Sequence, residues 1–570
     1  MGFILLRGIM RRILFLALCL LLCLCSCDFI TESTSESASS ESESESTNDG
    51  KITIEYRALD GGYIEGTALQ SIVVGEKGTA VRAIANEGYR FIGWDDGFNA
   101  SARLDSPSES VVICARFEKL FEVTFSCNKN HGYIDGQKEQ AVGSGQKTTY
   151  VTAVPKTGYR FVCWDSGETS DKIQISPTED IELVAIFSRV DLCLPVLAID
   201  TLDGSNRIPK GDYRDCTINV ENTEKYNFKG ESGGIRGRGN TSYQLDKRSY
   251  KIKFDNAIDL FGNGKAKEWT LISNHFDLSL SRNYLAYSVA YAIGLEYSSS
   301  VQFVDLYLNG EYRGVYLVCD QIEIGENRVN ITDSDALDTG YVIELDERED
   351  NTNFVIDRIP YSIKEPNTLR ADQIAFVEQY MNDCMSAIKG SDYSQIEALI
   401  DTESFARAYI VFEMFKCVDV GFSSFYMYKD AGDKLFCGPV WDFDRSVGNI
   451  SNNESARRYY YLWAKMDNVW FNYLLRHDEF KELVGSLLDE CTPIIEQTLS
   501  DCYTYLEENR VGFDRNFERW QILGTYVYPN PSELNNLRSW QEQLNFVKDY
   551  LKNSLAFLKN SYPAPTVESE

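Results

Sequence analysis

Three carboxylates in the C-terminal half are the residues best suited to chemistry. Asp419 follows an apolar segment at 405–415, and Asp442 and Asp444 follow a segment of strand character at 435–440. Two acids at alternate positions at the end of a strand, beside a third acid, could bind a hard cation such as Mg²⁺. An Asp-x-Asp pattern is also common in solvated turns, so the spacing alone leaves both interpretations open.

The densest basic patch of the chain lies at residues 236–254. Arg236 and Arg238 alternate with glycines, and in the strand expected over 250–254 Lys251 and Lys253 lie on one face. Glycines let the backbone approach a ligand closely, and cationic side chains neutralise phosphate oxygens. A solvated edge strand, with lysines that prevent aggregation, explains the same pattern equally well.

The segment Gly-Glu-Ser-Gly-Gly at 230–234 matches the G-x-S-x-G pattern of hydrolases. A nucleophile elbow needs an apolar strand before the serine and a helix after it, and neither is indicated here. The chain has only three histidines, His131, His275 and His477, that could act as the base. We therefore predict that Ser232 is a turn residue.

The elements that must position these residues describe an α+β domain. A helix capped by Asp277 is expected over 278–295 and a hairpin over 303–317, turning at Asn309-Gly310. Trp520 and Trp540 are expected in the core. Strands are expected at 340–346, 425–428 and 435–440, and helices at 405–415, 463–475, 480–506 and 534–558.

The N-terminus carries targeting signals. Arginines precede an apolar run at 13–24 that is too short to span a bilayer, and the run ends in Leu-Cys-Ser-Cys. This pattern resembles a lipobox, which predicts a lipoprotein signal peptide over 1–27 and acylation of Cys27; ordinary secretory cleavage is the alternative. Residues 28–50 contain seven acids, eight serines and no basic residue, which predicts a disordered tether.

Composition limits the possible functions. With 56 basic and 86 acidic residues the formal net charge is −30, which argues against a nucleic-acid-binding protein. Four of the fifteen cysteines lie in the leader, and the other eleven, from Cys114 to Cys502, have no C-x-x-C spacing, which excludes a zinc ribbon and a thioredoxin-like site. Most of these cysteines are expected to be buried as small hydrophobic residues.

Two repeats with a period of 70 follow the tether. Gly-Tyr-Arg-Phe at 88–91 recurs at 158–161, and Trp94 recurs as Trp164. Short alternating segments between glycine turns predict two small β-modules, over 51–118 and 119–188. They resemble divergent internalin-type B repeats, also called bacterial surface repeats. We interpret them as spacers, although their aromatic residues could also stack on sugars.

The ordered motifs between residues 190 and 560 resemble the CotH (spore-coat protein H) kinases, a family of atypical protein kinases. The resemblance implies a divergent kinase-like α+β domain with a helical C-terminal lobe, followed by a tail at 561–570. It also implies binding of ATP and Mg²⁺ or Mn²⁺. It rests on the segments 236–240, 247–250, Arg282-Asn283, 309–316 and 438–444.

The resemblance also implies roles for individual residues. Asp419 matches the catalytic acid that orients the acceptor hydroxyl, and Asp442 and Asp444 match a metal motif. Ser424 stands where protein kinases place an Asn that binds a second metal, and Asp320 stands where the family has a Glu. The residues implied in cofactor binding are Arg236, Arg238, Asn240, Lys247, Lys253 and Arg282.

The expected function is phosphoryl transfer outside the cytoplasm. A lipid-anchored kinase would move the γ-phosphate of ATP to Ser or Thr of an extracytoplasmic protein, with the membrane contacted through its anchor only. The alternative from another class is a non-catalytic surface adhesin built on the same fold. Transfer to a sugar hydroxyl, or of another nucleotide moiety, is a third possibility.

Overall fold

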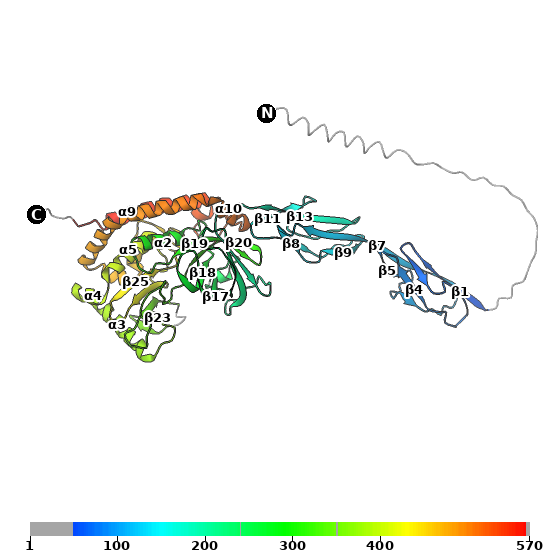
Figure 1. The fold of residues 1–570 in the computed structure, drawn as a ribbon, viewed down its shortest axis with the longest axis horizontal. Coiled ribbons are helices and arrows are strands. Elements are labelled where there is room, and N and C mark those ends of the chain that lie inside the picture. Colours follow the sequence, from blue (N-terminus) through cyan, green and yellow to red (C-terminus); the bar gives the residue numbers. More distant parts are fainter. Residues whose placement is uncertain (1–49, 240, 349–351, 566–570) are drawn as a thin grey trace, which may run out of the picture. The chain divides into compact units, whose positions relative to one another are not determined.

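The computed structural model describes residues 50–239, 241–348 and 352–565. The predicted leader with its lipidation residue Cys27, residues 28–49 of the predicted tether, and Asn240 lie outside the described residues. The chain divides into two compact units, the first ending at Lys119 and the second beginning at Leu120. An all-β N-terminal region precedes an α+β region, which confirms the predicted multidomain fold class (Figure 1).

The first repeat is a small β-structure around Trp94. Strand β1 pairs in parallel with β7 and antiparallel with β3, and β5 also pairs with β7. Ile54, Tyr56 and Trp94 are buried, and the guanidinium of Arg103 lies 4.8 Å from the centre of the Trp94 ring. The strands are β1 (Lys51–Ala58), β2 (Gly62–Glu65), β3 (Leu69–Val73), β4 (Val81–Ala85), β5 (Tyr89–Trp94), β6 (Ala102–Arg103) and β7 (Val111–Cys127).

The second repeat has the same organisation around Trp164. The later part of β7 pairs antiparallel with β9 and in parallel with β13, and Trp164 is fully buried. Ile173 stands at the position of Arg103 in the first repeat. The strands are β8 (Gly132–Asp135), β9 (Glu139–Gly143), β10 (Val151–Pro155), β11 (Tyr159–Trp164), β12 (Lys172–Ile173) and β13 (Ile181–Arg189).

A closed barrel of seven strands follows, in the order β14-β15-β16-β17-β18-β20-β19. Trp269 is fully buried in its interior. Asn309 and Gly310 both have positive φ in the tight turn between β19 and β20, which confirms the predicted hairpin. The strands are β14 (Val196–Thr201), β15 (Arg214–Glu221), β16 (Phe228–Gly237), β17 (Tyr250–Asp259), β18 (Lys265–Ile272), β19 (Val301–Leu308) and β20 (Glu311–Asp320).

Strand β16 corrects the prediction for Ser232. The residue is not in a turn but within the barrel strand, where it pairs with Thr217 of β15. No helix follows this segment, because β16 continues to Gly237 and only the short η1 (Ser242–Gln244) precedes β17. The nucleophile elbow is therefore absent, as the sequence analysis predicted.

A five-stranded antiparallel sheet carries the acidic motifs. Its order is β22-β23-β21-β24-β25, and helix α5 packs against β25. The last strand, β25, ends immediately before Trp441. The elements are β21 (Tyr341–Leu345), β22 (Phe354–Ile356), β23 (Ile359–Glu365), α3 (Ala371–Lys389), α4 (Tyr393–Leu399), α5 (Thr402–Phe415), β24 (Phe425–Lys429) and β25 (Leu435–Val440).

The remainder of the domain is helical, with boundaries that differ in part from those predicted. The expected helix at 278–295 begins only at Arg282, because Asp277 accepts hydrogen bonds in the turn before it. The expected helix at 463–475 is divided, and α10 was not predicted. The helices are α2 (Arg282–Ala292), α6 (Glu454–Arg457), α7 (Trp463–Asp467), α8 (Val469–Leu474), α9 (Asp478–Glu508), α10 (Arg510–Arg519), α11 (Ser532–Asn535) and α12 (Trp540–Ser561).

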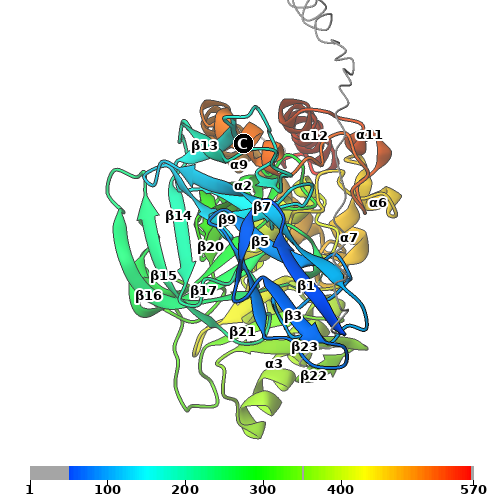
Figure 2. The same cartoon turned by 90° about the vertical axis from the view of Figure 1, so that its right-hand side faces the viewer.

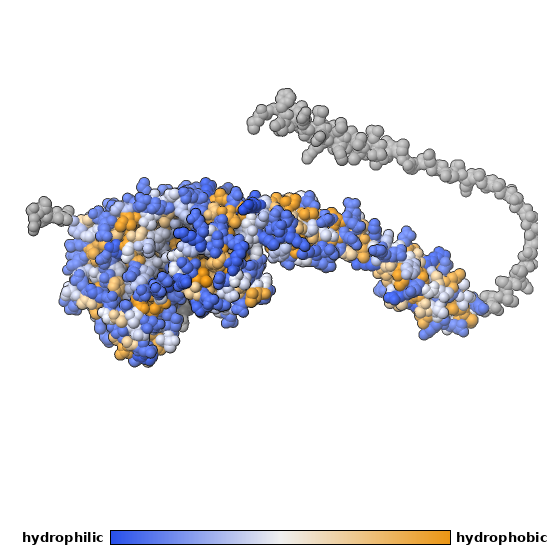
Figure 3. All heavy atoms as spheres, viewed as in Figure 1, coloured by the Kyte–Doolittle hydropathy of each residue, from blue (hydrophilic) through white to orange (hydrophobic). Residues whose placement is uncertain are grey.

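Long-range hydrogen bonds join these helices to the barrel and its neighbouring loops. Trp540 of α12 donates its indole N–H to the carbonyl of Ser279 at 2.8 Å, and Asn516 of α10 contacts Lys247. Figure 2 shows α11 and α12 on one side of the domain and the strands β14 to β17 on the other. The face drawn in Figure 3 is mainly hydrophilic, with hydrophobic residues in small separate groups.

Candidate active site

A cavity of about 820 Å³ contains the three acids that the sequence analysis singled out. Its walls come from the loop after β16, the turn after β18, α2, β24, the loops that follow β21, α5 and β25, and the loop before α11. These segments are up to about 290 positions apart in the sequence and meet only in the folded domain. The acids lining it are Asp246, Asp419, Asp442 and Asp444, and the basic residues are Arg238, His275, Arg348 and Arg445.

The loop that carries Asp442 and Asp444 is held by the start of α2. The backbone N–H of Asp442 donates to Tyr287 Oη at 3.2 Å, and that of Phe443 donates to Asn283 Oδ1 at 2.7 Å. Arg282 donates from Nε to the carbonyl of Ser446 at 2.9 Å. Asp442 has a φ of 65°, a left-handed conformation that this surrounding structure must maintain.

The two carboxylates of this loop repel each other. Burial raises the pKa of Asp442, and the nearby charge of Asp419 raises it further. Burial also raises the pKa of Asp444 well above its usual range, with a further contribution from Asp442. A bound divalent cation would relieve this repulsion, so the donor chemistry fits the predicted metal site.

The site at Asp442 and Asp444 suits a metal ion that is bound by only a few protein ligands. Within the described ranges, no group of three or more His, Cys, Asp or Glu side chains is arranged to hold a metal ion by itself. Mg²⁺ in kinases is typically bound by one or two carboxylates together with substrate phosphates and water. Asp442 and Asp444 could supply those carboxylates, with Ser424 as a neutral neighbour on the same cavity wall.

Asp419 lies in a turn that follows α5. Its carbonyl oxygen accepts hydrogen bonds from the backbone N–H groups of Phe422 and Ser423, each at 2.9 Å. Its carboxylate faces two guanidinium groups, with Oδ2 at 3.6 Å from Arg348 Nη2 and 3.9 Å from Arg445 Nη1. The turn ends at Ser424, whose N–H donates to Glu344 Oε1 at 2.9 Å.

A second cavity of about 430 Å³ adjoins the first and is rich in lysine. Arg238, Tyr426 and Trp441 line both cavities, and the Arg238 guanidinium lies 5.6 Å from the centre of the Trp441 ring. Lys253 pairs with Glu268 at 2.8 Å, and Lys251 pairs with the same carboxylate. The two cavities thus share three residues, and both contain acidic as well as basic side chains: the larger has the aspartates with three arginines, and the smaller has three lysines with three glutamates.

Three predicted cofactor-binding residues do not line either cavity. The ammonium of Lys247 is buried and donates to the carbonyl of Val315 at 2.7 Å and to Asn516 Oδ1 at 2.8 Å. Arg282 is fully buried and paired with Asp277. Arg236 lies over the ring of Tyr213, at 5.0 Å from its centre.

These placements correct the sequence analysis. Lys247 and Arg282 belong to the internal structure of the domain, since their charged groups already have buried acceptors. Arg236, within β16, lies over Tyr213 and lines neither cavity, whereas Arg238, just beyond the end of that strand at Gly237, lines both. Of the six predicted cofactor residues, the structure brings Arg238 and Lys253 to the cavities.

Asp320 also lines neither of the two cavities. It pairs with Arg328 at 3.2 Å and accepts the N–H of Ser300, and it lines a separate hollow. Burial raises the pKa of this carboxyl to about 6. The acidic partner of Lys251 and Lys253 is Glu268, not Asp320.

Several cavity residues were missed by the sequence analysis. Arg445 follows Asp444 directly, so its position next to the motif could have identified it. Arg348, Tyr526 and Tyr528 come from loops with no recognisable pattern, and only the fold brings them to the cavity. His275 also lines the cavity, and burial lowers its pKa to about 4, which keeps the ring neutral at ordinary pH.

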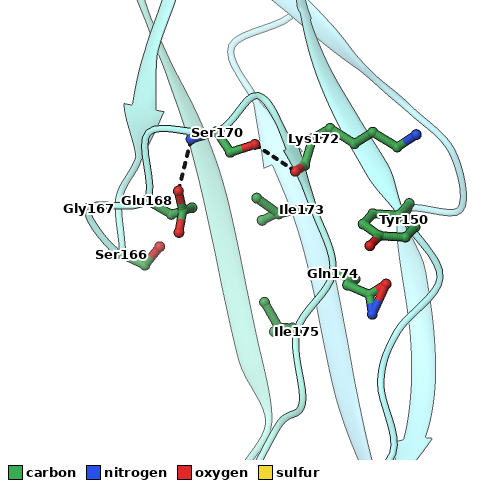
Figure 4. A pocket seen from close by; sticks show the side chains of 9 residues that line it. All are labelled: Tyr150, Ser166, Gly167, Glu168, Ser170, Lys172, Ile173, Gln174 and Ile175. Atoms are coloured by element: carbon green, nitrogen blue, oxygen red, sulfur yellow. Dashed lines mark hydrogen bonds between the residues drawn. The ribbon is translucent and has the colours of Figure 1, made fainter.

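The second repeat has a hollow of its own, which differs in chemistry (Figure 4). Glu168 accepts the N–H of Ser170 at 2.9 Å, and Ser170 donates its hydroxyl to the carbonyl of Lys172 at 2.8 Å. The Lys172 ammonium lies 5.1 Å from the centre of the Tyr150 ring. The hollow contains no histidine or cysteine, and the hydroxyl of Ser170 is bound to a backbone carbonyl, not to a base.

Comparison with known protein families identifies both parts of the chain. The family described as CotH kinase protein matches residues 235–558. The family described as divergent InlB B-repeat domain matches residues 52–120 and again 122–191. No curated protein matches the chain. In the part of the chain that the structure describes, every helix is too short or too polar to cross a membrane.

Proposed function

Because the chain belongs to the CotH kinase protein family, we propose that its C-terminal domain is an atypical protein kinase that transfers the γ-phosphate of ATP to Ser or Thr of extracytoplasmic proteins. One observation carries the proposal. Asp419, Asp442, Asp444 and Arg238 line a single cavity, although they come from three separate segments. Phosphoryl transfer needs such a set, with a base for the acceptor, acids for a metal and cations for phosphates.

In the proposed reaction, the acceptor oxygen forms a bond to the γ-phosphorus while the bond from that phosphorus to the β,γ-bridging oxygen breaks. ADP leaves with the electron pair of the broken bond, and Asp419 accepts the proton of the acceptor hydroxyl. The turn that holds Asp419 is fixed by two backbone hydrogen bonds, from Phe422 and Ser423. This rigidity keeps the carboxylate in one place as the acceptor binds.

Asp442 and Asp444 are assigned to Mg²⁺ or Mn²⁺, with Ser424 as the third predicted ligand. The metal, when bound, would neutralise phosphate oxygens and the charge that develops on the leaving group. The raised pKa of both carboxyls supports this assignment, since each charge is costly without a cation. Arg282 and Asn283 act as positioning residues by holding the loop that carries both acids.

The adjoining cavity is assigned to the nucleotide. Lys251 and Lys253 share Glu268 as a partner, and a Lys-Glu ion pair beside the phosphates is a recurring part of protein kinases. Arg238 lies where the two cavities meet, which suits a residue that neutralises phosphate. The flat rings of Trp441 and Tyr426 line the same junction.

The InlB B-repeat match indicates an extracellular location. We further propose that Cys27 is acylated and that the repeats hold the kinase domain away from the membrane, which the protein contacts only through this anchor. The acceptor is accordingly a protein outside the cytoplasm. The net charge of −30 makes a nucleic-acid partner unsuitable.

The test uses a chain that begins at residue 28, without the proposed lipidation residue Cys27, incubated with Mg²⁺ or Mn²⁺ and γ-labelled ATP. Three variants are compared with the wild type, namely Asp419→Asn, Asp442→Asn and the control Asp255→Asn, which changes an exposed acid of β17. We expect Asp419→Asn to lower labelling by a factor of about 10² to 10⁴, since general-base catalysis contributes this much. Asp442→Asn should abolish metal-dependent labelling, and the control should behave as the wild type.

The opposite outcome would favour the alternative function. A wild type that labels no acceptor and shows no metal-dependent thermal shift with ATP would contradict the kinase proposal. The chain would then be a surface-binding protein on a CotH-like fold. The observation that favours this alternative is that Ser424 stands in the place of a metal-binding Asn.

A further inference from the structure

Two arginines face the proposed base without forming close ion pairs. Arg348 Nη2 lies 3.6 Å and Arg445 Nη1 lies 3.9 Å from the same oxygen, Oδ2 of Asp419. Charge-assisted hydrogen bonds between guanidinium and carboxylate groups normally measure 2.7 to 2.9 Å. Both side chains keep about a third of their surface exposed, and Arg445 Nε is buried without a hydrogen-bond partner. The two guanidinium groups therefore retain capacity for another anion.

The position of the two arginines separates them from the nucleotide end of the site. Lys251 and Lys253 line only the smaller cavity, Arg348 and Arg445 line only the larger one, and Arg238 lines both. Arg348 also lies over Phe422, at 5.8 Å from the ring centre, in the turn that follows Asp419. The two lysines thus lie at the nucleotide end, Arg238 lies where the cavities meet, and Arg348 and Arg445 lie beside the base that receives the acceptor hydroxyl.

We propose that Arg348 and Arg445 bind carboxylates on either side of the acceptor hydroxyl, and that the acceptor is the Ser/Glu segment 28–49 of a second copy of this chain. This inference rests on the proposed kinase function and names its substrate. Arginine suits the role, because its planar fork binds carboxylates with two parallel hydrogen bonds.

The segment matches the arrangement around Asp419. Residues 41–46 read Glu-Ser-Glu-Ser-Glu-Ser, so Ser42 and Ser44 each stand between two glutamates. In an acceptor bound in polyproline II geometry, successive side chains are about 120° apart. A serine directed at Asp419 would then place its neighbouring glutamates to the two sides, where the two arginines lie.

The negative charge of this segment is complementary to the two arginines. Residues 28–49 contain seven acids and no basic residue, and the kinase domain is acidic overall, so binding depends on the local cations. Two folded repeats separate the segment from the kinase domain in the sequence. We therefore assign the acceptor to a neighbouring copy.

The transfer step forms and breaks the same bonds as for any hydroxyl acceptor. A serine Oγ bonds to the γ-phosphorus of ATP, the bond to the bridging oxygen breaks, and ADP departs. The hydroxyl proton passes to Asp419 and then to solvent. The product is a phosphoserine in the segment of the second copy, which adds close to two negative charges at each site.

A mixing experiment tests the acceptor. The Asp419→Asn chain from residue 28, with residues 28–49 unchanged, is mixed with an active chain. In the active chain every Ser and Thr of residues 28–49 is replaced by Ala. Mg²⁺ and γ-labelled ATP are added, and phosphosites are mapped by mass spectrometry. We expect phosphate in residues 28–49 of the Asp419→Asn chain, at a rate that increases with protein concentration. Labelling that is restricted to the active copy itself would overturn transfer between copies.

A charge-reversal experiment tests the arginines. Arg348→Glu should lower labelling of the native segment at least tenfold and should favour a segment whose glutamates are replaced by lysine. Arg445→Gln provides a milder second variant, and Arg207→Glu, an exposed arginine outside both cavities, is the matched control. Equal losses of labelling for the acidic and the lysine segments would assign the arginines to the phosphoryl group and contradict the inference.

Two unrelated acceptor proteins distinguish failure of this inference from failure of the kinase proposal. Dephosphorylated casein serves as an acidic acceptor and histone as a basic one. Labelling of either protein without labelling of the chain's own segment would overturn this inference while the kinase function stands. An absence of labelling on all acceptors, together with no consumption of ATP, would overturn both.

Discussion

The ammonium group of Lys247 is enclosed between the barrel and α10, and burial lowers its pKa to about 7. The folded chain releases this proton near pH 7, whereas the unfolded chain holds it up to its ordinary pKa of 10.5. Between these values the unfolded state binds more protons than the folded state. The free energy of unfolding should therefore rise with pH in this range, by up to about 1.4 kcal/mol per pH unit.

Replacement of Lys247 should remove this pH dependence. We expect the free energy of unfolding of the wild type, minus that of Lys247→Met, to increase from pH 7 to pH 9. Urea unfolding at each pH measures both values. Lys267→Met, which changes an exposed lysine of β18, is the control and should follow the wild type. Parallel pH profiles for wild type and Lys247→Met would show that the buried ammonium keeps its proton.

The repulsion between Asp442 and Asp444 leads to a prediction about metal binding. A cation that binds the folded state at 100 times its dissociation constant stabilises it by about 2.7 kcal/mol. We expect Mg²⁺ with ATP to raise the melting temperature of the wild type but not that of Asp444→Asn. Without metal, Asp444→Asn should be at least as stable as the wild type, because it removes one of two repelling charges.

Calorimetry with and without EDTA checks this prediction. Ca²⁺ at the same concentration provides a comparison cation with a longer bond to oxygen. A large loss of stability in metal-free Asp444→Asn would mean that the carboxylate has a structural partner in the fold.

At the scale of elements, the start of α2 is what holds the acidic loop in place. Arg282 pairs with Asp277 and donates to the carbonyls of Ser446 and Val447, all within the core. Arg282→Met would leave the Asp277 carboxylate buried and unpaired. Such a loss costs about 3 to 5 kcal/mol, and the affinity for the metal should fall with it, because the loop loses its support.

The double variant Asp277→Leu/Arg282→Met separates these two effects. Removal of both charges should restore part of the stability while the loop remains unsupported, so metal-dependent stabilisation should stay weak. Lys481→Met removes an exposed ion pair with Asp478 and should cost less than about 1 kcal/mol. Unfolding in urea gives all three values, and full recovery of metal binding in the double variant would contradict the role of Arg282.

Local patterns predicted most of the strands and the acidic site. The Asn309-Gly310 turn, the alternation in β17 and the apolar segments of β24 and β25 are encoded by neighbouring residues, so the sequence was sufficient for them. Asp419, Asp442 and Asp444 were singled out because they come within a few residues of the end of a regular element, and the fold brings all three to one cavity. The helix at 463–475 was not predicted as two pieces, because Asn468 caps α8 from within the apolar pattern.

Roles that depend on distant residues were not predictable. Lys247 lies in a basic run that suggests a surface, but Asn516 covers it from 269 positions away. Arg348 belongs to a loop whose own sequence has no pattern, and only the sheet brings it to Asp419. Arg282 resembled a ligand residue because its buried partner, Asp277, was interpreted as a helix cap alone.

At the scale of the whole molecule, the chain contains two compact units that meet in sequence at Lys119 and Leu120. Each repeat has its own buried tryptophan and its own hydrophobic cluster. We therefore expect a chain that begins at residue 120 to unfold at the same temperature as the corresponding transition of the longer chain, within about 2 °C. Differential scanning calorimetry checks this, and a lower transition temperature would show that the first repeat stabilises the second.

The bonds that complete the kinase domain join its first segments to its last. Asn530 donates to the carbonyl of Phe276, Trp540 donates to that of Ser279, and Asn516 contacts Lys247. Such distant contacts form late and slow the folding of a domain. Because the chain is synthesised from its N-terminus, Phe276 and Ser279 are made long before their partners, which lie 254 and 261 positions later in the sequence. This domain can therefore close only after nearly the whole polypeptide has been made.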